Sequence, residues 1–148
     1  MIFRPKHFKA YELVGPDLYE RFGEDCFRYL RRELLEAIDS LWAELNGIKK
    51  TVVIVNDWKS GGQYKESGLR TAASTTYKPG SAHSVGAAVD LKCRGWTPRE
   101  VITLLKARSV PHHTLNYFRR YENPSITPTW NHLDVMEGDH VGLLEVNL

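Results

Sequence analysis

Two histidines and one aspartate in this chain have the residue types and spacing that suit a metal ion. His83 and Asp90 lie seven positions apart in the run S-A-H-S-V-G-A-A-V-D, and His132 follows in a separate segment. Imidazole nitrogen and carboxylate oxygen are both common zinc ligands, and three protein ligands leave one position of a tetrahedral ion open. A histidine on its own is more often structural than metal-binding, so the pattern identifies three candidate ligands rather than a site.

The segments around these residues predict how they could meet. Small residues lead from His83 into 87–93, which we predict to be a strand, and 131–136 is expected to be a second strand. If the two strands lie side by side, the turn that carries His83 folds back beside Asp90. Both histidines and the aspartate then lie at one point.

Hydrophobic periodicity predicts the remaining elements. Apolar residues recur at steps of three and four over 26–45, which indicates an amphipathic helix ended by Asn46 and Gly47. Thr97, Pro98 and Glu100 form a helix start with a capping box. The other expected segments are a short helix over 17–22, strands over 51–56 and 141–146, a helix over 97–107 and a long irregular stretch over 57–80.

This order of elements predicts an α+β fold, with a mainly antiparallel sheet flanked by helices. A length of 148 residues suits a single compact domain, 1–148. His112 and His113 have no nearby carboxylate pattern, so we interpret them as loop or helix-end residues.

Composition excludes several classes of partner. The net charge is only +2 and basic residues alternate with acidic ones, which argues against nucleic acid. No run approaches the roughly 20 apolar residues of a membrane helix, so we expect no membrane partner. The first residues lack the pattern of a signal peptide, which predicts synthesis in the cytoplasm and reduced Cys26 and Cys93.

The spacing S-x-H-x-x-G-x-A-x-D, followed by an aromatic-x-H-x-D, resembles the zinc D-Ala-D-Ala carboxypeptidase family of metallopeptidases. That family includes phage endolysins that cut bacterial cell-wall peptides, and it shares its fold with the hedgehog signalling domain. Two further segments support the resemblance: 67–70 is similar to the family's S-G-[YF]-R, and 8–13 to its F-x-x-x-E-L opening. The similarity extends over about residues 3 to 136.

The resemblance implies one zinc ion (Zn2+) per chain, with His83, Asp90 and His132 as ligands. It also implies hydrolysis of an amide bond in peptidoglycan stem or cross-link peptides, by a carboxypeptidase or an endopeptidase. Zinc would supply an activated water and polarise the carbonyl.

The same resemblance assigns residues to the substrate. Arg70 matches a family arginine near the active site, where its planar guanidinium suits a peptide carboxylate or carbonyl. Ser81 either holds substrate or fixes the turn before His83. Trp130, beside the last ligand, is expected in the substrate pocket.

The chain departs from the family where a general base is expected. Several members carry glutamate three residues before the last ligand, or histidine two before it, but Thr129 and Trp130 occupy these positions. Asp134 shares a strand face with His132, so we expect it to act as general base or to orient His132. Three other acidic residues are further options and are interpreted as solvated surface: Glu122, Glu137 and Asp139.

Other functions remain open at this stage. The missing base favours a catalytically inactive, zinc-containing module that binds cell wall, and a virion structural protein is a related alternative. A globular protein with incidental histidines is the third. For the enzyme we expect a monomer that acts on the cell wall and is phage-encoded or virion-associated.

Overall fold

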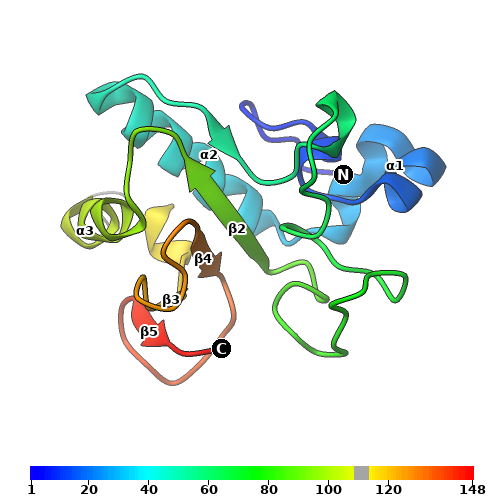
Figure 1. Ribbon diagram of the computed structural model, residues 1–148. Coiled ribbons are helices and arrows are strands. Elements are labelled where there is room, and N and C mark those ends of the chain that lie inside the picture. The colour runs from blue at the N-terminus through cyan, green and yellow to red at the C-terminus, as the bar shows by residue number, and fades with distance from the viewer. Residues whose placement is uncertain (109–113) are drawn as a thin grey trace.

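The computed structural model describes residues 1–108 and 114–148, and it builds three α-helices and a five-stranded sheet from them (Figure 1). The α-helices are α1 (Pro16–Phe22), α2 (Arg32–Ile48) and α3 (Pro98–Arg108). The strands are β1 (Val53–Ile54), β2 (Ala88–Cys93), β3 (Arg120–Glu122), β4 (Asn131–Asp134) and β5 (Leu144–Val146). Four short 3-10 helices connect them: η1 (Ala10–Glu12), η2 (Gly23–Tyr29), η3 (Trp58–Ser60) and η4 (Leu115–Tyr117).

The sheet has the order β1-β2-β4-β3-β5. Its pairs are antiparallel except β3 with β5, which is parallel. The prediction of a single compact α+β domain with a mainly antiparallel sheet is therefore confirmed. The expected neighbours β2 and β4 do pair, with Asp90 opposite His132.

Alternation along these strands divides the sheet into an apolar face and a polar face. Val89, Leu91 and Leu133 belong to one buried core that also contains the apolar face of α2. This helix runs behind β2 in Figure 1. The intervening residues, Asp90 and His132 among them, must then point to the opposite face of the sheet.

The predicted helix over 26–45 was wrong at both ends. Residues before α2 form η2, and Arg31 is extended because its N–H donates to the Gly86 carbonyl at 2.9 Å. A tertiary contact therefore interrupts a continuous hydrophobic period. At the other end the helix continues through Gly47 to Ile48, so this glycine does not terminate it.

The strand bounds also differ from the predictions. β1 is shorter than 51–56 because the N–H groups of Thr51 and Asn56 donate to Asn46 and Glu12 instead of a neighbouring strand. β4 ends at Asp134 and β5 begins at Leu144, whereas β3 was not predicted at all. β3 contains a single apolar residue, Tyr121, so its sequence shows no hydrophobic alternation.

The helix start at Thr97 is confirmed: Thr97 and Glu100 exchange hydrogen bonds at 2.9 and 3.2 Å. The pair His112 and His113 lies outside the described residues. Among the described helices, none combines the length and apolar character that crossing a membrane requires.

Candidate metal centre

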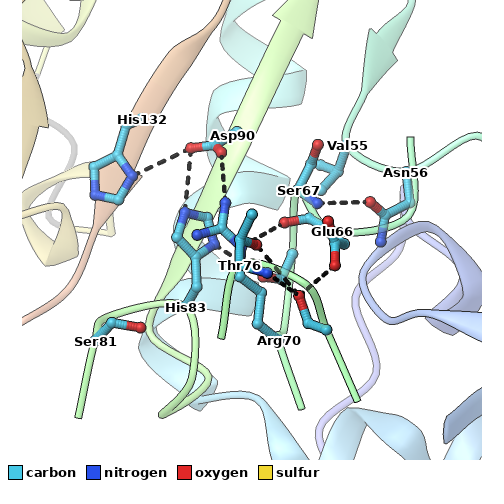
Figure 2. A network of polar contacts seen from close by, with 12 residues as sticks. Val55, Asn56, Glu66, Ser67, Arg70, Thr76, Ser81, His83, Asp90 and His132 are labelled. Atoms are coloured by element: carbon cyan, nitrogen blue, oxygen red, sulfur yellow. Dashed lines mark hydrogen bonds and ion pairs between the residues drawn. The ribbon is translucent and has the colours of Figure 1, made fainter. Parts of the chain in front are cut away.

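His83, Asp90 and His132 converge on the polar face of the sheet. Asp90 Oδ1 lies 3.3 Å from His83 Nε2 and 3.2 Å from His132 Nδ1 (Figure 2). Ligand atoms from all three residues lie within 4.8 Å of one another. Both histidines are buried, with 5 % and 3 % of their surface exposed. This group could hold a metal ion.

The ring of His83 is held by the backbone of the preceding loop. Its Nδ1 lies 2.9 Å from the carbonyl oxygen of Gly68, which can only accept, so Nδ1 carries the hydrogen. Nε2 is then the nitrogen with a lone pair, and it is the one that faces Asp90. Such a hydrogen bond on the far nitrogen is the usual support of a metal-binding histidine.

The ring of His132 is held in the same way by a carboxylate. Its Nε2 lies 2.9 Å from Oδ2 of Asp134, so Nδ1 is the nitrogen directed at Asp90. Asp134 is completely buried, and it also receives hydrogen bonds from Arg120 Nε at 3.0 and 3.1 Å and from Met136 N–H at 3.2 Å. Of the two expected roles for Asp134, this geometry favours the orienting one.

The pKa values of Asp90 and His132 depend on each other because the two side chains are hydrogen-bonded. Burial alone would raise the pKa of Asp90, but hydrogen bonds from His132 and His83 hold that pKa well below its usual value. Burial would lower the pKa of His132, yet its bonds to Asp134 and Asp90 raise that pKa to about 9. Without a metal, the ring of His132 therefore carries a proton between itself and Asp90.

Gly68 explains why the loop over 57–80 can reach His83. A Cβ at this position would lie 2.1 Å from the carbonyl oxygen of Leu13, so only glycine allows the two backbones to approach. The neighbouring Leu69 N–H donates to the same carbonyl at 2.8 Å. Ser67 is fixed as well, since its carbonyl accepts from Asp90 N–H at 2.7 Å.

Gly86 has a matching role in the turn that carries His83. Its φ is +71°, and a Cβ there would lie 2.2 Å from the carbonyl oxygen of Tyr29. The turn can therefore pack against the segment before α2 and enter β2 directly. A glycine three residues after His83 is thus required for the turn to pack against Tyr29.

The three candidate ligands line a cleft of about 680 Å³ that the predicted substrate residues also line: Arg70, Ser81 and Trp130. Arg70 donates from Nε to the Glu66 carbonyl at 2.8 Å and from a terminal nitrogen to Asp90 Oδ2 at 3.4 Å. Ser81 Oγ bonds Ser84 Oγ at 2.8 Å. Ser81 therefore fixes the turn before His83 and also faces the cleft.

Sequence reasoning underestimated Glu122. It was interpreted as solvated surface, but it lies in β3, is only 8 % exposed and lines the same cleft as the three ligands. The only indication in the sequence was the order polar, aromatic, polar in Arg120, Tyr121 and Glu122, which places Glu122 on the face of a strand opposite to Tyr121. Glu137 and Asp139, by contrast, are exposed as expected.

Comparison with known proteins adds no family to this geometry. No protein-family model, no curated protein and no solved structure matches the chain.

Proposed function

We propose that this protein is a zinc-dependent peptidase that hydrolyses an amide bond in peptidoglycan peptides. The observation that carries the proposal is the convergence of His83, Asp90 and His132 in a cleft. Their order along the chain and the S-x-H-x-x-G-x-A-x-D spacing around His83 and Asp90 resemble those of the zinc D-Ala-D-Ala carboxypeptidases, whereas Thr129 and Trp130 before His132 depart from that family.

The donor set fits zinc. Two imidazole nitrogens and one carboxylate oxygen are ligands that zinc accepts, and three protein ligands leave a position for water or substrate. The far nitrogen of each histidine already has a partner, in the Gly68 carbonyl and in Asp134. A zinc ion bound here would supply a water of lowered pKa and a Lewis acid for the scissile carbonyl.

The other residues of the cleft suit an anionic peptide. Arg70, Lys78 and Arg120 line it and bring three positive charges to the region around the ligands. Free carboxylates are abundant on peptidoglycan stem peptides, and a guanidinium binds a carboxylate through two parallel hydrogen bonds. Arg120 contacts both oxygens of the buried Asp134 at 2.9 to 3.1 Å, whereas the contact of Arg70 with Asp90 is longer, at 3.4 Å. Arg70 and Lys78 are therefore the better candidates to position substrate.

The metal is the first thing to test. Purified protein should contain about one zinc per chain, and His83→Ala should lose it. His7→Ala is the control, because His7 is exposed and stacks on Trp42 far along the chain from the ligands. Absence of zinc from protein with all three ligands intact contradicts the proposal.

Hydrolysis is tested separately, as release of free amino groups from isolated cell-wall sacculi by the zinc-loaded protein. Wild type should release them, and His83→Ala should not. A zinc-containing protein that binds sacculi without any release is instead a cell-wall-binding module. The lack of an acidic residue or histidine at Thr129 and Trp130 is the observation that favours this second function.

A further inference from the structure

The register of the sheet places a second carboxylate beside the candidate ligands. β3 pairs with β4 through Arg120 opposite Asp134 and Tyr121 opposite Leu133. Continued by one residue, this antiparallel register sets Glu122 opposite His132. Because Asp90 is opposite His132 on the other side, Asp90, His132 and Glu122 form one row across β2, β4 and β3.

Members of such a cross-strand row point to the same face of the sheet, with Cβ atoms of neighbours about 4.5–5.5 Å apart. Glu122 therefore shares the polar face with two of the three ligands. It also lines the same cleft as they do.

The hydrogen bonding of Glu122 leaves it able to accept a proton. Within the described part of the chain, its Oε1 accepts a hydrogen bond from Leu148 N–H at 3.2 Å. Asp134 differs, because His132, Arg120 and Met136 occupy both of its oxygens. A carboxylate that already holds a histidine and an arginine is poorly suited to take up and release a proton.

The remaining acidic residues near the site are less suitable. Glu66 is held by the hydroxyl and N–H groups of Thr75 at 2.8 to 3.2 Å and by the hydroxyl of Ser74, and it faces a different cavity. Glu137 is exposed and does not line the cleft of the ligands. Glu122 is thus the carboxylate that combines burial, cleft position and an available oxygen.

We propose that Glu122 is the proton acceptor of the hydrolytic water, an inference that rests on the proposed function. The water oxygen forms a bond to the carbonyl carbon as Glu122 takes one of its protons. The C–N bond then breaks, and Glu122 returns this proton to the nitrogen of the leaving amine. The products are a carboxylic acid and an amine, and Glu122 is regenerated as a carboxylate.

The test compares Glu122→Gln with Glu137→Gln in the full chain. Glutamine keeps the size of Glu122 and can still accept from Leu148 N–H, but it cannot take up a proton. With zinc bound, we expect kcat on sacculus fragments to fall by about 10²- to 10⁴-fold in Glu122→Gln and to stay unchanged in Glu137→Gln. Zinc affinity should be the same in both variants and the wild type.

A second readout does not depend on activity. In the Co2+-substituted protein, protonation of a carboxylate hydrogen-bonded to the water at the metal changes the visible spectrum. Wild type should show a pH-dependent spectral transition that Glu122→Gln lacks. Identical transitions in both proteins overturn the inference. A tenfold or larger loss of metal affinity in Glu122→Gln also overturns it, because Glu122 would then be a ligand.

The two readouts separate the two proposals. If wild type releases no amino groups but its spectral transition depends on Glu122, the peptidase proposal fails and with it the role of Glu122 in hydrolysis, although Glu122 still contacts the water at the metal. If wild type is active and Glu122→Gln retains full kcat, the peptidase stands and Glu122 is not the acceptor. A chain that binds neither Zn2+ nor Co2+ contradicts both.

Discussion

His132 Nε2 lies 2.9 Å from Oδ2 of Asp134, and this single contact determines which ring nitrogen of His132 can reach a metal. Because Asp134 is fully buried and occupies Nε2, the ring presents Nδ1 toward Asp90. Asp134 would therefore act on a bound metal through His132, from the side away from the candidate ligands.

Asp134→Asn is expected to weaken zinc binding by about 10- to 100-fold, the usual cost of losing the carboxylate that supports a metal-binding histidine. Competition with a chelator of known affinity measures this loss. At saturating zinc, turnover should recover most of its wild-type value. A loss of turnover by several orders of magnitude with zinc fully bound contradicts this assignment and makes Asp134 a general base.

Zinc affinity should rise with pH. In the metal-free protein the pKa of His132 is raised from 6.5 to about 9, so between these values the folded ring holds a proton that zinc must displace. One proton released per zinc bound makes the apparent affinity increase about tenfold per pH unit. Chelator competition at pH 7 and pH 8 measures the slope, and a flat profile contradicts the proton between His132 and Asp90.

The same raised pKa also affects the stability of the metal-free protein. A group whose folded pKa exceeds its unfolded value stabilises the fold below the unfolded pKa, and this stabilisation is lost as pH rises through the folded pKa. The contribution of His132 is therefore fully present below about pH 6.5 and lost by about pH 9. Urea unfolding of metal-free wild type and Asp134→Asn at pH 6, 7.5 and 9 separates this contribution from those of other groups.

Gly68→Ala should damage both stability and metal binding. The added Cβ would lie 2.1 Å from the Leu13 carbonyl oxygen, and the loop would have to move away from His83. We expect a loss of about 1–3 kcal/mol in the free energy of unfolding and weaker zinc binding. Gly47→Ala is the matched control: it lies in α2, where an added Cβ would meet no atom within 4 Å, so it should stabilise by about 0.5–1 kcal/mol.

Both cysteines should be unreactive in the folded chain. Cys26 and Cys93 are free and buried, and burial raises the pKa of their thiols to about 11 and about 12. The reactive thiolate is therefore scarce near neutral pH. Iodoacetamide at pH 8 should label neither residue in native protein and both in urea. Rapid labelling of Cys93 in native protein would show that the edge strand β1 separates from β2.

Much of the fold follows from local patterns. The capping box at Thr97 predicted the start of α3, and the composition of 87–93 predicted β2, because both depend on near neighbours in the chain. The break before α2 could not be predicted in this way, since it depends on a hydrogen bond from Arg31 to the distant Gly86. β3 was missed because three residues are too few to show a period.

The sequence by itself determined the chemistry available at the site: two imidazoles and a carboxylate, with glycines at the two positions where backbones must touch. Only the tertiary structure decided how that chemistry is arranged. The register between β4 and its two neighbours places Asp90 and Glu122 on either side of His132, and a shift of one residue would turn each side chain to the opposite face. The roles of Asp134 and Glu122 therefore depend on strand pairing, which residue spacing along the chain does not record.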